Sequence, residues 1–277
     1  MELPIFATVL IIVLAVIVFI VALYLFLIAP RKTKDMEKYK NVMYAHRGLH
    51  NEERAENSMS AFRAAVEAGY GIELDVRLSK DGKLVVFHDD TLDRVCGREG
   101  KVIDFTADEL AKVSLSGTSD GIPLFTDVLS LVDGKIPLLV EIKEDPGNSA
   151  VSNKTCDILK DYKGDFVIES FNPLSLSTVK KRLPNVSRGI LCQQYTKIDQ
   201  FKKPLYYILQ LMLTNVTCRP AFIAFFHKHP NALSLKVARA LFKIPTLAWT
   251  VKSAEEEKLA RENGFDGIIF EGYIPKA

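Results

Sequence analysis

Three acidic residues in two predicted strands have the spacing of a metal site. Successive side chains of a strand point to opposite faces, so Glu73 and Asp75 share one face while Leu74 lies on the other. Glu141, in the predicted strand 137–143, supplies a third carboxylate. Buried, unpaired carboxylates repel one another, and a divalent cation removes that cost. Because all the ligands are oxygens, the pattern favours one Mg²⁺ or Ca²⁺ ion over zinc.

Two cations and two histidines fall near the same predicted strand ends. Lys143 shares a face with Glu141 by the same alternation, and Arg47 follows the first predicted strand. In one interpretation these cations only neutralise the acids in a structural cluster. In the other they hold an oxygen-rich anion such as phosphate beside the metal. His46 and His88 then form a general acid–base pair. Phosphoester cleavage is the chemistry that uses all of these groups.

Short apolar runs that alternate with helical patterns must position these residues. Strands are predicted at 41–47, 72–78, 84–88, 137–143, 166–171, 189–192, 246–251 and 267–270, and helices at 57–68, 126–132, 149–162, 173–183 and 253–263. This alternation favours a parallel sheet with helical crossovers, closed into an α/β TIM (β/α)8 barrel whose active site lies at the strand C-terminal ends. An open doubly wound sheet is the alternative, but it would want a glycine-rich phosphate loop, and the sequence has none.

Three segments interrupt this regular pattern. Asp81-Gly82 between two strands predicts a hairpin. The polar segment at about 91–122 is predicted to be a small insertion after the third strand. The apolar region 201–226 is ambiguous. Within it, 204–213 is either a buried barrel helix or a lip that meets the membrane or an acyl chain.

The N-terminal stretch is long and uncharged. No charged residue lies between Glu2 and Arg31, and roughly 20 apolar residues are enough for a helix to cross a bilayer. A signal peptide would want a basic start, a shorter apolar core and a small-residue cleavage site, which the sequence lacks. A buried core helix is the other alternative. We predict a transmembrane anchor at 1–30, a basic juxtamembrane linker at 31–40 and the barrel at 41–277.

The charge distribution predicts the side of the membrane. The net charge is only +2, which does not favour a nucleic-acid partner. No Lys or Arg precedes the anchor, whereas five follow it closely: Arg31, Lys32, Lys34, Lys38 and Lys40. The positive-inside rule therefore predicts a single-pass membrane protein whose catalytic domain faces the cytoplasm. The four cysteines lack metal-type spacing and are expected to be reduced core thiols.

The sequence resembles a known family along most of its length. The run AHRGLHNEERAENSMSAFRAAVEAGYGIELDVRLSKDGKLVVFHDDTLDR is similar to the signature of the glycerophosphodiester phosphodiesterases. The later segments IPLFTDVL, LLVEIK, ESFNP, AWTV and FDGIIF match in order, so the resemblance covers about 42–273. It implies a TIM barrel with a small insertion after the third strand. It also implies metal-dependent cleavage of glycerophosphodiesters to sn-glycerol 3-phosphate and an alcohol.

The resemblance also implies roles for individual residues. The implied metal ligands are Glu73, Asp75 and Glu141. The implied acid–base pair is His46 and His88, one assisting attack by a substrate hydroxyl and the other protonating the leaving alcohol, in an order left open. Arg47 and Lys143 would hold the phosphate, Glu56 would position the glycerol or a water, and Trp249 would line the substrate pocket.

Departures from the family pattern are few. Ala55 and Ser58 replace the usual Pro and Thr, and Glu271-Gly272 stands where the family more often has Thr-Asp, at the C-terminal rim. Lysophospholipase D-type cleavage of lysophospholipids at the membrane is one alternative, and a related barrel enzyme of the phospholipase D or phosphoinositide type is a second. A non-catalytic, membrane-anchored binding protein is another, against which the intact acid and histidine set argues. If the barrel faced outward, glycerophosphate polymers would become possible substrates. The implied partners are a glycerophosphodiester or lysophospholipid and the membrane; no protein partner is indicated.

Overall fold

The computed structural model describes residues 4–31, 39–198, 201 and 203–275, and in this part of the chain the strands close into a barrel. Eight parallel strands form it: β1 (Met43–His46), β2 (Gly71–Leu78), β4 (Leu138–Ile142), β5 (Phe166–Ser170), β6 (Arg188–Cys192), β7 (Phe222–Phe226), β8 (Thr246–Val251) and β9 (Gly267–Phe270). Because β1 pairs with both β2 and β9, the sheet has no free edge between the first and last strands. The predicted TIM barrel is confirmed.

The predicted hairpin forms, but its second strand is not part of the barrel. β3 (Leu84–Val86) pairs antiparallel with β2 at the edge of the sheet. It ends at Val86, so the prediction that His88 closes a third barrel strand is wrong: His88 lies in the loop that follows. The inserted segment after β3 contains α3 (Asp93–Cys96), η2 (Val102–Asp104) and α4 (Ala107–Leu110). It packs around β3 in a hydrophobic cluster of its own.

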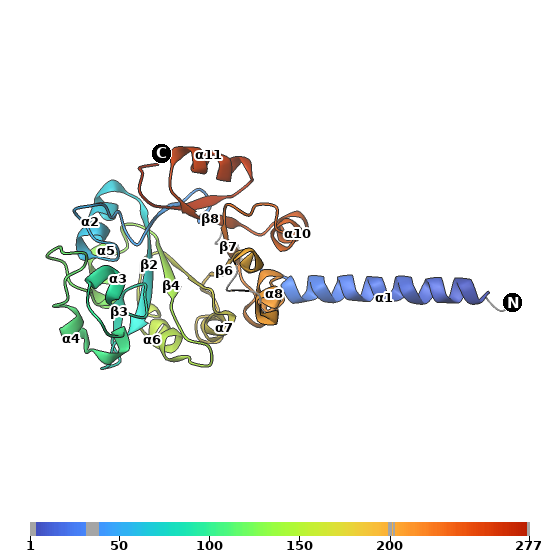
Figure 1. Cartoon of the computed structure of the whole chain (residues 1–277), viewed down its shortest axis with the longest axis horizontal. Coiled ribbons are helices and arrows are strands. Elements are labelled where there is room, and N and C mark those ends of the chain that lie inside the picture. The colour runs from blue at the N-terminus through green and yellow to red at the C-terminus, as the bar shows by residue number, and fades with distance from the viewer. Residues whose placement is uncertain (1–3, 32–38, 199–200, 202, 276–277) are drawn as a thin grey trace.

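Helices cover the outside of the barrel (Figure 1). They are α2 (Met59–Ala68), α5 (Phe125–Val132), α6 (Ala150–Leu159), α7 (Pro173–Arg182), α10 (Leu233–Phe242) and α11 (Ala254–Glu262). Side chains cap two of these helices: Ser58 accepts from Ala61 N at the start of α2, and Asn172 accepts from Leu174 N before Pro173. We had not predicted α10. The four cysteines are free thiols, and three of them are buried, as expected.

The strand alternation sorts side chains into an outer and an inner core. Outward residues pack under the helices, whereas inward ones fill the barrel with an apolar plug of Tyr44, Leu139, Val167, Leu191, Phe222, Leu247 and Ile269. On β1, β2, β4 and β5, and directly after β9, the inward residues toward the strand C-termini are polar: His46, Glu73, Asp75, Glu141, Glu169 and Glu271. The plug therefore forms the floor of any site at the C-terminal mouth.

Gly189 of β6 makes room for the ring of Phe222 in the plug. A Cβ at this position would lie only 2.1 Å from a ring carbon of Phe222 on the neighbouring strand. Glycine is needed here because of this close approach, not because of its backbone angles.

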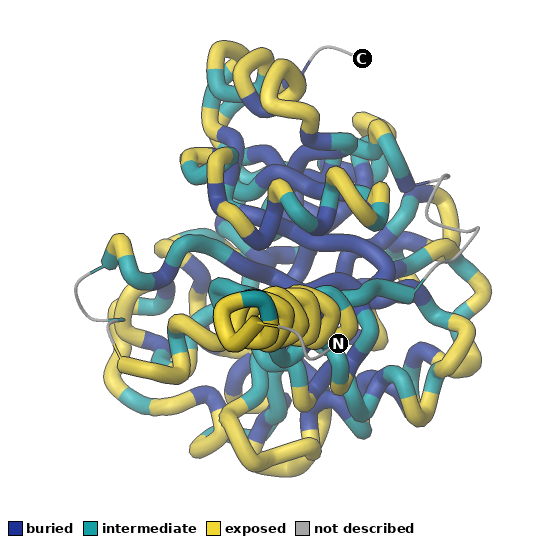
Figure 2. Tube along the Cα trace, turned by 90° about the vertical axis from the view of Figure 1, so that its right-hand side faces the viewer, coloured by how far each residue is buried: buried dark blue, intermediate teal, exposed yellow. Residues whose placement is uncertain are grey.

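One long apolar helix projects from this barrel. α1 (Ile5–Ile28) is 24 residues long and almost entirely exposed, and it contains an 18-residue stretch of mean hydropathy 3.5, so it is long and apolar enough to cross a membrane. Figure 1 shows it as a rod whose tip carries the N-terminus, and Figure 2 shows its exposed surface end-on. Most of the predicted linker, residues 32–38, lies outside the described residues.

The ambiguous region between β6 and β7 forms short helices. After η3 (Tyr195–Lys197) come α8 (Pro204–Gln210) and α9 (Asn215–Cys218), which leads into β7. The interpretation of 204–213 as a buried barrel helix is wrong for α8, in which no residue is buried. The reason is that the short connection places α8 outside the helical layer, at the base of α1 (Figure 1).

The packing at Gly189 predicts the effect of a single methyl group. Gly189→Ala is expected to lower the free energy of unfolding by about 1–3 kcal/mol, because the methyl group overlaps the ring of Phe222. The measurement is thermal unfolding of the full chain in detergent. Adding Phe222→Leu should recover part of the loss by making room. An unchanged midpoint for Gly189→Ala would contradict this account of the plug.

Candidate active site

Four carboxylates gather at one level of the barrel mouth. The strand register places Asp75 beside Glu141 and Glu141 beside Glu169, while Glu73 pairs with His46 on the other side. All four acids are buried. One ligand oxygen each from Glu73, Asp75 and Glu141 lies within 4.8 Å of the others, so these three residues could hold a metal ion. The two-residue spacing in the sequence thus becomes a compact acidic cluster.

Two cations and one amide partly balance this cluster. Lys143 Nζ lies 2.6 Å from Glu141 Oε1 and 3.2 Å from Asp75 Oδ1. Arg47 Nε lies 3.5 Å from Asp75 Oδ2, and its backbone N–H donates to Glu73 Oε2 at 3.0 Å. Asn57, at φ +53°, donates its amide to Asp75 Oδ2 at 2.9 Å. The ion pairs of the structural interpretation therefore exist, but they leave the acids in excess.

The surplus negative charge is visible in the acid–base properties of the cluster. Burial and the neighbouring Asp75 raise the pKa of Glu73 well above its usual range. Burial raises the pKa of Glu141 to about 7, although Lys143 opposes it. Burial alone would raise the pKa of Asp75, but the electrostatic effects of Lys143, His88 and Arg47 outweigh it and lower the pKa. Oδ1 of Asp75 and Oε1 of Glu141 are buried and receive no hydrogen bond of normal geometry. This donor set fits a hard divalent cation.

Glu169 is an acid of the cluster that the sequence analysis did not single out. It is 1% exposed, and its Oε2 has no hydrogen-bond partner. Burial, followed by the charges of Glu141 and Glu73, raises its pKa well above the usual range. Its buried position therefore disfavours the ionised form beside the other three acids. The signal was present in the ESFNP segment, where Glu169 precedes the end of a predicted strand by two residues.

His46 is held by an acid from the last strand. Its Nδ1 lies 2.7 Å from Glu271 Oε2, and Lys252 Nζ lies 3.1 Å from the other oxygen of Glu271. The remaining ring nitrogen, Nε2, lies 4.0 Å from Glu73 Oε2. Glu271 is the residue at which the sequence departs from the family pattern, and the sequence analysis gave it no role. Only the closure of β9 against β1 shows that it reaches His46.

His88 has a matching arrangement from the loop after β3. Its Nδ1 lies 2.6 Å from Asp89 Oδ1, and Arg94 Nε donates to Asp89 Oδ2 at 2.6 Å. Arg94 also forms a two-point contact with Glu56, at 2.7 and 2.8 Å. Glu56 in turn accepts from Arg47 Nη1 at 2.6 Å. The inserted segment thereby connects to the acidic cluster, because Arg94 belongs to α3.

Both histidines are set up to exchange protons at one nitrogen. A carboxylate on Nδ1 favours the tautomer that donates there, which leaves Nε2 with a free lone pair. Burial lowers the pKa of His46, although Glu271 opposes the change, and burial lowers the pKa of His88 to about 4. Both rings are thus neutral near pH 7. Such a pair can take a proton from one group and deliver a proton to another.

An aromatic wall stands beside Lys143. The ring of Phe171 lies 5.9 Å from Lys143 Nζ and meets Trp249 edge-to-face at 5.5 Å between centroids. Trp249 also contacts Phe226 at 5.2 Å. The predicted pocket residue Trp249 is therefore near the cluster, but it reaches Lys143 through Phe171.

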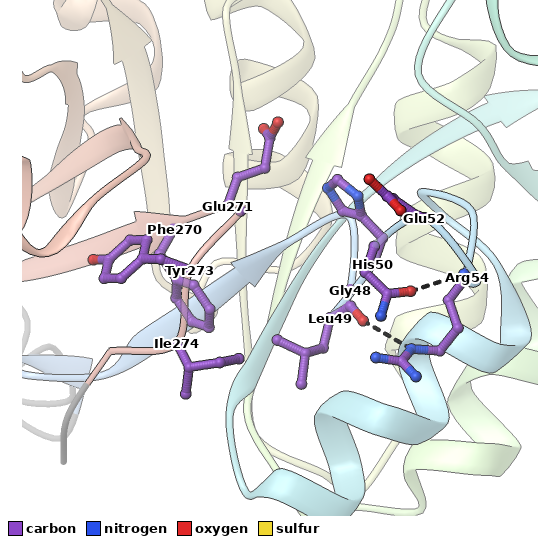
Figure 3. Close-up of a pocket in the computed structure, with 11 residues that line it drawn as sticks. Gly48, Leu49, His50, Glu52, Arg54, Phe270, Glu271, Tyr273 and Ile274 are labelled. Carbon is purple, nitrogen blue, oxygen red and sulfur yellow. Dashed lines mark hydrogen bonds between the residues drawn. The ribbon is translucent and has the colours of Figure 1, made fainter.

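A cavity of about 630 Å³ adjoins the site on its β1–β9 side. The loop after β1, including His50 and Arg54, forms one wall, and the segment from Phe270 to Ile274 forms the other (Figure 3). Glu271 is the one lining residue that also contacts a catalytic candidate, through its contact with His46. The cavity is therefore next to the acidic cluster and not over it.

Comparisons with known proteins identify the family. The model of the glycerophosphoryl diester phosphodiesterase family matches residues 46–272, which span the whole cluster. The chain belongs to this family. A glycerophosphodiester phosphodiesterase of Caldanaerobacter subterraneus is 40% identical over 169 residues, 56% of this chain and 68% of that protein. The protein is accordingly a phosphoric diester hydrolase of the glycerophosphodiester type.

Solved structures of glycerophosphodiester phosphodiesterases share the fold. The enzyme from Thermotoga maritima superposes with a TM-score of 0.64 at 27% identity, covering 83% of this chain and 94% of that one. A phosphodiesterase from Oleispira antarctica, solved with sn-glycerol 3-phosphate, gives a TM-score of 0.69 at 21% identity, covering 84% and 94%. Both match the barrel predicted from the sequence.

The Glu271 contact predicts a specific defect. Glu271→Gln should lower kcat about tenfold to a hundredfold with little change in KM, because His46 loses the charge that orients it. Glu271 raises the pKa of His46, so its loss should move the His46 limb of the pH–rate profile to lower pH. Steady-state kinetics from pH 4 to pH 9 provide the measurement.

Glu255→Gln, an exposed acid on the neighbouring α11, is the matched control and should leave the profile unchanged. A Glu271→Gln enzyme with the parent's pH profile would show that Glu271 does not position His46.

Proposed function

We propose that this protein hydrolyses glycerophosphodiesters to sn-glycerol 3-phosphate and an alcohol, using one divalent cation, Mg²⁺ or Ca²⁺. The observation that carries the proposal is the buried cluster of Glu73, Asp75 and Glu141, placed between two carboxylate-held histidines. Family membership supports the reaction, and the product-bound Oleispira relative supports the product. The substrates in view are diesters that arise in phospholipid turnover.

The residues divide the work as follows. The cation would be held by the three carboxylates and would stabilise negative charge that develops on the phosphoryl oxygens. Lys143 and Arg47 bring positive charge to the same place and bind the phosphate. Glu56, fixed by Arg47 and Arg94, positions the glycerol end or a water. Phe171 and Trp249 shield the phosphate from solvent on the remaining side.

The two histidines move the protons. One takes the proton from the attacking hydroxyl at Nε2. The other reacts in its protonated form, with a proton on both nitrogens, and delivers the Nε2 proton to the leaving alcohol. Where the attacking hydroxyl belongs to the glycerol, a cyclic phosphate forms and a water molecule then opens it. Glu271 and Asp89 keep the Nδ1 protons in place throughout.

We also propose that residues 1–30 anchor the enzyme in a membrane, with 31–40 as linker and the barrel of 41–277 on the cytoplasmic side. The length and apolarity of α1 and the basic residues that follow it support this topology. Lysophospholipids are the second candidate substrates, with lysophospholipase D-type cleavage. The exposed apolar side chains of α8 at the base of α1 favour them.

Histidine substitutions test the acid–base assignment. His46→Ala and His88→Ala should each lower kcat by about a hundredfold or more, since each ring serves one proton transfer. The assay follows release of sn-glycerol 3-phosphate from glycerophosphocholine by the full chain in detergent. His229→Ala, a histidine away from the cluster, is the control. Near-normal turnover in either variant would remove that histidine from the mechanism.

Metal removal tests the role of the acidic cluster. Treatment with EDTA should abolish product release, and Mg²⁺ or Ca²⁺ should restore it. The same ions should raise the melting temperature of the parent but not of Glu141→Gln, because binding to the folded state alone stabilises it. Undiminished activity in EDTA after dialysis would refute the metal requirement. Hydrolysis of lysophospholipids but not of glycerophosphocholine would favour the second substrate class.

A further inference from the structure

The transmembrane-length helix is docked on the barrel and not merely tethered to it. Arg219, which follows α9 at φ +48°, donates Nη1 to the carbonyls of Phe26 at 2.6 Å and Ala29 at 3.0 Å. Its guanidinium also stacks 4.8 Å above the Phe26 ring. The free carbonyls and negative dipole end of a helix C-terminus favour such a cation. Arg31 N–H donates to Pro220 O at 3.0 Å, and Ile28 is only 2% exposed.

The position at which burial begins places the barrel relative to a bilayer. Residues 5–23 of α1 are nearly all exposed, and contact with the barrel begins at Tyr24. At about 1.5 Å per residue this free stretch is about 28 Å long, close to the roughly 30 Å hydrocarbon core. The docked last turn then lies at the boundary between hydrocarbon and headgroups. The connection between β6 and β7, which holds that turn, lies there with it.

α8 exposes an apolar face at this boundary. Leu205, Tyr207 and Ile208 are 55%, 49% and 41% exposed within a helix of only seven residues. Tyr206 and Leu209 face inward and are half-buried. Single exposed leucines are ordinary on protein surfaces, but three large apolar side chains on two turns are not. Leu, Ile and Tyr beside the exposed Lys203 make the composition typical of the membrane interface.

Cys192 lies between α8 and the base of α1. The Cys192 thiol, at the end of β6, donates to Leu209 O of α8 at 3.7 Å and lies close enough to Tyr24 of α1 to interact with it electrostatically. On its other side Tyr206 of α8 contacts Tyr195 at 5.7 Å between ring centroids, so α8 packs on the segment that follows β6.

A basic cavity lies at the same end of α1. It measures about 410 Å³ and is lined by Pro30, Arg31, Lys180, Pro184, Arg188 and Arg219, without an acidic residue in this lining. The side chains donate to backbone carbonyls: Lys180 to Thr217 O at 3.0 Å, and Arg188 to Cys218 O at 2.6 Å. Arg188 is only 2% exposed, and burial together with the nearby Arg31 lowers its pKa to about 10. These cations repel one another and lack a counter-ion in the lining.

We propose that the β6–β7 connection and the docked end of α1 form a membrane-contact surface for an anionic phospholipid bilayer. α8 inserts Leu205, Tyr207 and Ile208 among the lipids, and the basic cavity takes the phosphate of an anionic headgroup. The inference rests on the proposed membrane span. It goes beyond anchoring, because it fixes one orientation of the barrel relative to the lipid surface.

Single tryptophans test the placement of α8. Trp249 is the one tryptophan of the chain, so Trp249→Phe gives a background for Leu14→Trp in α1, Tyr207→Trp in α8 and Ile103→Trp in the insertion. The insertion lies across the barrel from α1 (Figure 1). The full chain is placed in nanodiscs of phosphatidylcholine with brominated acyl chains. The brominated lipid should lower the fluorescence of a tryptophan at position 14 or 207 roughly twofold or more. The fluorescence of a tryptophan at position 103 should not change.

The three tryptophan positions distinguish failure of the membrane-contact surface from failure of the proposed membrane span. Quenching at 14 but not at 207 would overturn the membrane-contact surface and leave the anchor standing. No quenching at 14 would refute the proposed span itself. Should Trp249→Phe fail to fold, the same substitutions are made with Trp249 retained, and the change in quenching relative to the parent is measured. If position 207 is shielded from aqueous iodide but not quenched by bromolipid, a protein partner covers α8, and the proposal is wrong.

Matched lysines test the basic cavity. Lys180 lines it, whereas its neighbour Lys181 on α7 is exposed and does not. Replacing phosphatidylcholine by phosphatidylglycerol in the nanodiscs should raise the melting temperature of the parent and of Lys181→Gln. The rise should be mostly lost in Lys180→Gln. Equal rises in the two variants would show that the cavity binds no anionic headgroup.

Discussion

The structure depends on burying a layer of carboxylates on top of an apolar plug. The inward positions of the barrel are filled with large apolar side chains at the bottom and with acids at the mouth. Carboxylates buried in this way cost free energy unless positive charge or protons compensate them. Lys143, Arg47 and the raised pKa values of Glu73, Glu141 and Glu169 supply part of that compensation. The negative charge that these groups leave uncompensated defines the place for a divalent cation.

The same shortage of positive charge explains the surroundings of the cluster. Each histidine carries a carboxylate on Nδ1, and each of those carboxylates is neutralised farther out by a cation, Lys252 for Glu271 and Arg94 for Asp89. Charge therefore alternates outward from the acids, so no ionised group next to the histidines stands alone. The inserted segment contributes one such cation and is thereby part of the site, although its core is separate.

The connection between β6 and β7 has a different task from the other crossovers. Elsewhere a helix of eight residues or more covers the neighbouring strands, but here α8 and α9 are short and the end of α1 packs against α9. The barrel thus uses the last turn of the apolar helix α1 to complete its own outer core, in which Ile28 is buried. This packing makes the direction of α1 a property of the folded domain.

The sequence by itself determined the repeated strand–helix order, the barrel, the free apolar helix and the grouping of most of the polar site residues. It could do so because strand alternation and helix periodicity are local properties, and because parallel strands bring their C-terminal ends together. Glu73, Asp75 and Glu141 needed only this rule to converge. The hairpin at Asp81-Gly82 was equally local.

Only the tertiary structure decided which residues complete the site and where the apolar helix sits. Glu271 lies 225 positions from His46, and barrel closure alone makes them neighbours. Glu169 joins the acids through strand register, and Arg219 meets Phe26 across 193 positions. The exposure of α8 could not be predicted from the sequence either. An apolar segment has the same composition whether it packs in a protein core or faces a bilayer. Such contacts depend on how distant strands close and pack, which no local pattern of residues encodes.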